Sequence, residues 1–374
     1  MHLNQALLVA YGYGDGGGGA NREMLEMRRR LNRMPGLPKV VTGRADEYFD
    51  QLHQTIDPVE REVSRWDEEL YLEHHRGTYT SQAYQKRTDR KLELMYRETE
   101  WLNVLAGLLG GTDYVARQQE LNLGWKIILR NQFHDIIPGS SIAEVYQDSQ
   151  EEYREAETIA RQVWTKSLRS LSGDEQASSS YRVLNSAVFK QAGIVVRISL
   201  AAEEAAFVDR EGQPLVAQKV EAAWWVWCSQ VPALGWTTIY HKPGLASSET
   251  VVSEFQLNDG ELVTPYYRWR WNRAGQWIEL YDRLADRQVL APGELGNALE
   301  VFQDKPVDSD AWNIEIFYQE KCRLVDHLER VETVSVGPVA AVLRFHWSYA
   351  HSKIVQKVTF YSHSPRIDMV TSVD

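Results

Sequence analysis

The spacing of hydrophobic residues predicts a helical region in the middle of the chain. From Ala83 to Leu109, apolar residues recur every three or four positions, which is the spacing of one helix face. The same spacing predicts helices over 115–137 and 141–171, separated by Pro138-Gly139. Three helices joined by short turns are enough for a bundle, so we expect a three-helix domain over 59–172.

Beyond this region the hydrophobic period changes to two. The small, polar residues of 171–180 predict a domain boundary. Apolar segments between turn signals such as Asn258-Asp259-Gly260 then predict antiparallel strands. The expected strands are 181–184, 194–198, 224–227, 236–240, 251–257, 266–271, 339–347, 354–361 and 367–373. Strands of this number and spacing predict a large antiparallel β-sandwich over 181–374.

The first 58 residues have the pattern of an α/β segment. An apolar run from Gln5 to Tyr11 predicts a buried strand, which leads through a glycine-rich loop to a helix from Arg22 to Leu31. Val40-Val41 predicts a second strand, and a helix from Ala45 to Gln54 follows. These few elements cannot close a core by themselves, so we interpret 1–58 as the C-terminal remnant of an α/β domain. The predicted fold class is multidomain α+β.

Composition narrows the range of functions. The 374 residues carry a net charge of -11, which argues against nucleic acid or an anionic membrane as a partner. No stretch reaches the roughly 18 apolar residues of a membrane span, and no signal peptide is recognisable, so we expect a soluble protein. Cys228 and Cys322 match no metal or redox spacing, and we expect two buried thiols in a reducing cytoplasm. The 13 tryptophans could stack on sugars, but we expect most of them to fill sandwich cores.

Candidate chemistry lies where two predicted helices meet. The spacing places His134 and Asp135 in the last turn of the first helix, and Ser141 with Glu144 has the pattern of a capping box for the next. A lone histidine beside an aspartate is more often a structural pair than a metal ligand. A second candidate is Asp15 in the glycine-rich loop, because α/β sheets bind ligands where strands end. No Gly-Lys-Ser/Thr follows, so this loop is a poor phosphate loop.

Three segments resemble one known family. Asn-Gln-Phe-His-Asp-Ile-Ile-Pro-Gly-Ser at 131–140 resembles a signature of glycoside hydrolase family 38, the zinc-dependent α-mannosidases. Gly-Asp-Gly-Gly-Gly-Gly at 14–19, with the helix after it, and His-Arg-Gly-Thr-Tyr-Thr-Ser-Gln at 75–82 resemble segments of the same family. The strand-rich half resembles the C-terminal β domains of the family at 231–235, 280–282 and 304–312.

The resemblance implies a role for each matching residue. His134 would be a zinc ligand, and Asp135 would contact the sugar. Asp15 would be a candidate general acid/base, and further sugar contacts would come from His75, Arg76 and Tyr79. The implied activity is retaining, zinc-dependent hydrolysis of α-mannosides, with a mannose-containing oligosaccharide as substrate. Family members often associate, so a homo-oligomer is also expected.

The chain departs from the family in what it lacks. No histidine fits the family's N-terminal His-x-Asp zinc motif, and no aspartate is recognisable as the nucleophile. Retaining hydrolysis needs two carboxyl groups about 5 Å apart, and catalytic zinc needs three or more protein ligands. The hypothesis is therefore a fragment of an α-mannosidase that is inactive alone and does not hold zinc tightly. A non-catalytic carbohydrate-binding module and a structural or oligomerisation module remain the alternatives.

Overall fold

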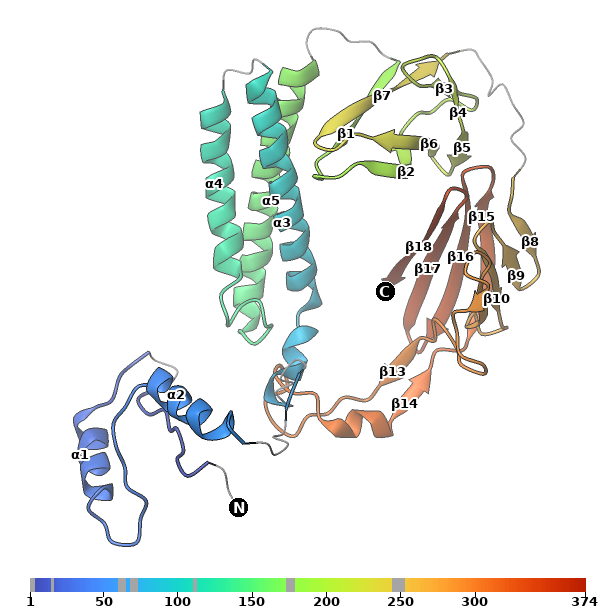
Figure 1. Ribbon diagram of the computed structural model, residues 1–374. Helices are drawn as coiled ribbons and strands as arrows, with labels where there is room; N and C mark the ends of the chain where they lie inside the picture. Colours follow the sequence, from blue (N-terminus) through green and yellow to red (C-terminus); the bar gives the residue numbers. More distant parts are fainter. Residues whose placement is uncertain are drawn as a thin grey trace. The chain divides into compact units, whose positions relative to one another are not determined.

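The computed structural model describes residues 4–14, 17–59, 65–67, 73–109, 113–172, 179–243 and 253–374. The chain divides into two compact units, Met1–Leu70 and Tyr71–Asp374, and each is considered by itself. Helices dominate the first part of the larger unit and antiparallel sheets dominate the rest (Figure 1). This arrangement confirms the predicted α+β class.

The N-terminal unit contains two helices, α1 (Arg22–Leu31) and α2 (Ala45–Ile56). The side chain of Asn21 caps α1 by accepting a hydrogen bond of 2.8 Å from the backbone N–H of Met24. The predicted strands at 5–11 and 40–41 are wrong, because both segments are irregular and Leu7 is 83% exposed. A strand needs a hydrogen-bonded neighbour, and the described part of this unit offers none beyond an isolated bridge between Tyr13 and Gly18.

Three helices form the expected bundle. A short 3-10 helix, η1 (Glu73–Tyr79), precedes α3 (Ala83–Leu108), α4 (Tyr114–Asn131) and α5 (Ala143–Ser172) (Figure 1). Their common core consists of Leu92, Tyr96, Leu121, Ile128, Tyr153, Ala156, Ala160 and Val163.

Gly124 allows α4 to approach α3 closely. A Cβ atom at Gly124 would lie only 1.6 Å from the hydroxyl oxygen of Tyr96. That hydroxyl donates a hydrogen bond of 2.6 Å to the backbone carbonyl of Ala156 on α5. The buried Tyr96 ring therefore occupies the space above Gly124 and links all three helices.

The first pair of sheets follows α5. One sheet has the strand order β1-β7-β3-β4 and the other has the order β2-β6-β5. The bounds are β1 Ser180–Asn185, β2 Gln191–Ile198, β3 Ala206–Val208, β4 Pro214–Leu215, β5 Ala217–Val220, β6 Ala223–Val231 and β7 Gly235–Lys242. A core that includes Ile198, Phe207, Trp224 and Ile239 joins the two sheets.

The second pair of sheets carries the largest core. The strand orders are β12-β11-β10-β9-β8 and β15-β16-β17-β18. The bounds are β8 Gln256–Asn258, β9 Glu261–Val263, β10 Tyr267–Trp271, β11 Trp277–Asp282, β12 Arg287–Gln288, β15 Leu328–Val336, β16 Ala340–Tyr349, β17 Ser352–Tyr361 and β18 Ser364–Val373. Four buried tryptophans, Trp269, Trp271, Trp277 and Trp347, contribute to this core. The β region is therefore built from two pairs of sheets, and these tryptophans fill the core of the second pair.

A two-stranded ribbon lies outside these sheets. It pairs β13 (Glu300–Phe302) with β14 (Cys322–Leu324), and a short 3-10 helix, η2 (Ile316–Glu320), lies between the two strands in sequence. Because Cys322 lies on this ribbon it is exposed, so the expectation of a buried thiol holds for Cys228 and is wrong for Cys322.

None of the helices in the described part of the chain is long and apolar enough to span a membrane.

Candidate functional site

His134 and Asp135 lie in a series of tight turns after α4. The helix ends at Asn131, so the prediction that both residues belong to its last turn is wrong. The backbone N–H groups of Ile136 and Ile137 both donate to the carbonyl of Phe133, at 2.8 and 3.1 Å. Proline disfavours helical geometry in the residue before it, so the chain leaves the helix upstream of Pro138. We call residues 133–141 the histidine turn.

The histidine turn presents its two polar side chains to solvent. The side chain of His134 is 77% exposed and that of Asp135 is 55% exposed. The His134 Nε2 atom lies 3.5 Å from an Asp135 carboxylate oxygen, and the Phe133 ring packs 4.2 Å from the imidazole, centroid to centroid. Both side chains are accessible to a ligand.

Ser141 and Tyr146 close the histidine turn. The Ser141 hydroxyl donates a hydrogen bond of 2.5 Å to the backbone carbonyl of Asp135. The Tyr146 hydroxyl accepts from the Ser141 N–H at 2.9 Å and donates to the Ile136 carbonyl at 3.3 Å. The Ser141 hydroxyl is thus engaged with Asp135, and the predicted capping box with Glu144 is wrong. The serine fixes the turn rather than the start of α5.

The two residues that start the signature hold the end of α4. Asn131 donates 2.7 Å to a carboxylate oxygen of Glu152 on α5 and accepts a hydrogen bond from Ser149. Gln132 donates to a carboxylate oxygen of Asp89 on α3 at 3.1 Å. Burial raises the pKa of the Asp89 carboxyl group. Polar contacts to both neighbouring helices therefore fix the position from which the histidine turn departs.

Lys86 joins the histidine turn to the segment before α3. Its ammonium group donates to the carbonyls of Ser81, Ile137 and Pro138 at 2.5, 2.8 and 3.2 Å. Gly139 has a φ of +95°, and a Cβ atom there would lie 2.6 Å from the Ser81 carbonyl oxygen. Burial lowers the pKa of Lys86. Two of the segments singled out in the sequence, 75–82 and 131–140, therefore meet.

Replacing Lys86 by methionine is expected to loosen the histidine turn. Methionine keeps a long, unbranched side chain but removes the donor shared by three carbonyls, which should lower the free energy of unfolding by about 1–3 kcal/mol. Urea denaturation would measure the loss, and hydrogen exchange of residues 136–139 should accelerate. Lys126→Met, at an exposed position of α4, is the control. Equal effects of the two changes would contradict the assignment.

A third segment, which belongs to the β region, contacts Gly77 and Ser81. The backbone N–H of Gly77 donates 2.7 Å to the Trp312 carbonyl, and the Ser81 hydroxyl donates 2.9 Å to the Ala311 carbonyl. A Cβ atom at Gly77 would lie 2.8 Å from the Trp312 carbonyl carbon, so only glycine fits this contact. The Gly77 hydrogen bond thereby holds the chain around Trp312 against η1.

The predicted sugar contacts other than Asp135 lie on η1. His75 packs edge-on against the Trp312 ring, with centroids 5.4 Å apart, while Arg76 is half-buried and Tyr79 is 61% exposed. Their sugar-binding role stays a prediction. Asp15 lies outside the described residues. Within the part of the chain that the structure describes, no three His, Cys, Asp or Glu side chains gather as a metal site.

Three family models match separate parts of the chain. The family model of the glycosyl hydrolases family 38 N-terminal domain matches residues 1–69, that of the alpha mannosidase middle domain matches 73–171, and that of the family 38 C-terminal domain matches 262–374. Alpha-mannosidase G of Dictyostelium discoideum is 27% identical over 420 residues, which cover 99% of this chain and 36% of that protein. Alpha-mannosidase 2C1 of Mus musculus is 25% identical over 97% of this chain and 33% of its own length.

A solved structure has a similar fold. A glycosyl hydrolase family 38 protein from Enterococcus faecalis matches with a TM-score of 0.65 over 95% of this chain and 49% of that one, at 12% identity. The chain spans about a third of the length of the two curated relatives.

Proposed function

Since the chain belongs to glycoside hydrolase family 38, we propose that it supplies the histidine turn and its supporting domains to an α-mannosidase. The observation that carries the proposal is the exposed His134-Asp135 pair. The pair lies on a turn that hydrogen bonds from Lys86 and Tyr146 hold in place. An exposed imidazole is available as a metal ligand. Its neighbouring carboxylate can accept hydrogen bonds from the hydroxyl groups of a sugar.

Among the described residues, His134 is the one that we propose as a zinc ligand. A catalytic zinc takes three protein ligands and leaves a position open, whereas the described residues do not form such a set. His134 would therefore be one ligand, and the others would come from outside the described residues.

The remaining roles follow from the family. Asp135 would orient the mannose ring, and His75, Arg76 and Tyr79 would border the substrate. Retaining hydrolysis needs a nucleophilic carboxylate and an acid/base about 5 Å from it, and Asp15 is the candidate for the second role. The proposed substrate is a mannose-containing oligosaccharide, and self-association is part of the proposal.

Hydrolysis of an aryl α-mannoside, measured together with zinc content, tests the proposal. We would assay this chain and the longest translated form of its gene. We expect stoichiometric zinc and hydrolysis with retained anomeric configuration only in a form that has the full ligand set. If neither form binds zinc nor cleaves the substrate, the histidine turn is structural. The chain would then be a carbohydrate-binding or scaffolding module.

A further inference from the structure

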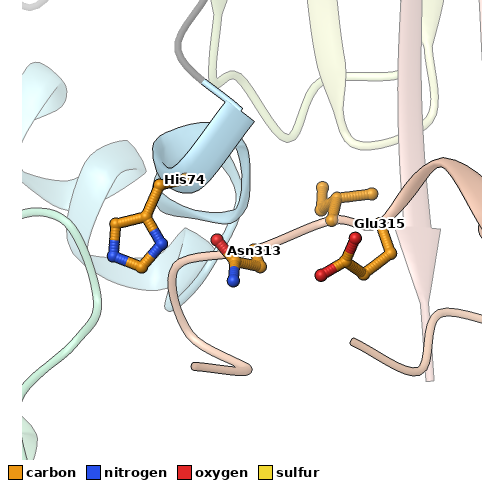
Figure 2. Close-up of a pocket in the computed structure, with 4 residues that line it drawn as sticks. His74, Asn313 and Glu315 are labelled. Carbon is orange, nitrogen blue, oxygen red and sulfur yellow. The ribbon is translucent and has the colours of Figure 1, made fainter. Parts of the chain in front are cut away.

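An open pocket lies where η1 meets the segment after Trp312. Its lining consists of His74, Asn313, Ile314 and Glu315, and its volume is about 250 Å³ (Figure 2). Sites for drug-sized ligands run from roughly 300 to 1,000 Å³, so this pocket suits a ligand as small as one monosaccharide ring. None of the four residues has a role in the function proposed above.

The polar groups of the pocket suit a neutral ligand rich in hydroxyls. In Figure 2 the Asn313 amide lies between the His74 imidazole and the Glu315 carboxylate. The Asn313 amide nitrogen donates 2.9 Å to the Asp308 carbonyl, whereas its buried Oδ1 atom accepts no hydrogen bond within the described part of the chain. A carboxylate accepts hydrogen bonds only, so Glu315 favours hydroxyl donors and disfavours anions.

The aromatic side of the pocket is held in place. The His74 imidazole stacks on the Trp312 indole with an interplanar angle of 4° and centroids 6.1 Å apart. The 2.7 Å hydrogen bond from Gly77 to the Trp312 carbonyl fixes this pair from the η1 side. Aromatic faces with a few convergent polar groups are the usual composition of small-molecule sites.

One set of hydrogen bonds joins the pocket to the histidine turn. Ser81 donates to the Ala311 carbonyl, next to Trp312, and its own carbonyl accepts from Lys86. Lys86 also donates to the carbonyls of Ile137 and Pro138. The pocket and the histidine turn are therefore connected by hydrogen bonds. A ligand long enough to reach both Asp135 and the pocket would contact two connected parts of the fold.

We propose that this pocket is a sugar subsite that takes one ring of the substrate, other than the ring oriented by Asp135. The inference rests on the proposed function for the identity of the sugar, a neutral α-linked mannose unit. Asn313 and Glu315 accept hydrogen bonds from its hydroxyls, and His74 contacts the ring. These residues determine preference among oligosaccharides rather than catalysis.

Titration of the 374-residue chain with an α-linked mannobiose, followed by NMR, tests the subsite. We expect millimolar binding, weakened about tenfold by Glu315→Gln and by Asn313→Ala, because each change alters one hydrogen-bonding group. Glu294→Gln, an exposed glutamate on a turn, is the control and should bind like the unchanged chain. Circular dichroism would confirm folding, and the isosteric Glu315→Gln serves if Asn313→Ala unfolds.

The result separates the subsite from the catalytic proposal. Mannobiose binding that is weakened in the pocket variants but kept in Glu294→Gln supports the subsite, even if hydrolysis and zinc binding are absent. Absence of binding, or equal binding by all variants, overturns the subsite whatever the activity. Tighter binding of mannose 6-phosphate than of mannobiose would also overturn it, because Glu315 should repel an anion.

Discussion

Alanine in place of Gly124 is expected to destabilise the three-helix bundle severely. The added methyl group would lie 1.6 Å from the Tyr96 hydroxyl oxygen, so the ring would have to move and give up its hydrogen bond to Ala156. Overpacking a core costs about 1–3 kcal/mol, and a broken buried hydrogen bond costs a further 1–3 kcal/mol. The helix propensity of alanine recovers only about 1 kcal/mol.

Gly107→Ala is the matched control for this prediction. It introduces the same methyl group into α3, but the nearest atom would be the Tyr114 Cβ at 3.3 Å, on an exposed side chain. Its free energy of unfolding should change by no more than about 1 kcal/mol. Urea denaturation monitored by circular dichroism compares the two variants. A Gly124→Ala variant as stable as Gly107→Ala would show that α3 and α4 are not as close as described.

Alanine in place of His134 is expected to abolish zinc binding and mannosidase activity in the form of the protein that has both. Loss of an outer-shell partner of a metal ligand already costs about 10–100-fold, so loss of the ligand itself should cost more. The side chain is exposed, so the fold should be unaffected. Zinc content by mass spectrometry and hydrolysis of an aryl α-mannoside are the two measurements.

His351→Ala provides the control, because it removes an exposed imidazole from the turn between β16 and β17. Its zinc content and activity should equal those of the unchanged protein. Were His134→Ala to keep its zinc and its activity, the histidine turn would not be part of the catalytic site.

The local structure of the helical region was largely predictable from the sequence. α3 begins at Ala83 and ends one residue before the predicted Leu109, because a long apolar stripe identifies one continuous helix. α1 begins at the predicted Arg22, and the side chain of Asn21 caps it. In both cases the determining interactions lie within a few residues of one another.

The errors in the strand predictions occurred where structure depends on distant residues. The apolar run from Gln5 to Tyr11 is not a strand, because strand formation requires a partner that hydrophobicity alone does not reveal. β15 (Leu328–Val336) was missed because glutamate, serine and threonine interrupt its apolar positions. It pairs with β16 along its length, and this pairing makes it a strand.

Some residues of the candidate site were predictable from the sequence, and others became visible only in the structure. The signature at 131–140 identified His134 and Asp135, and Lys86 gave no signal because a lysine on a helix usually lies in solvent. Its role is visible only once the carbonyls of Ser81 and Ile137 are brought together. The pocket around Asn313 was also out of reach, since it joins segments that are more than 200 residues apart, as Ser81 and Ala311 are.

The hydrogen bond between Ser81 and Ala311 has a consequence for the order of folding. It closes a loop of 230 residues, whereas the hydrogen bonds of Tyr96 and Gln85 between α3 and α5 close loops of 60 and 64 residues. Long loops carry an entropic cost that must be met before their contacts form, so nonlocal contacts form slowly. The bundle can therefore assemble while the β region is still forming. The contact of Trp312 with η1 needs both regions, so the pocket beside it forms only once both have folded.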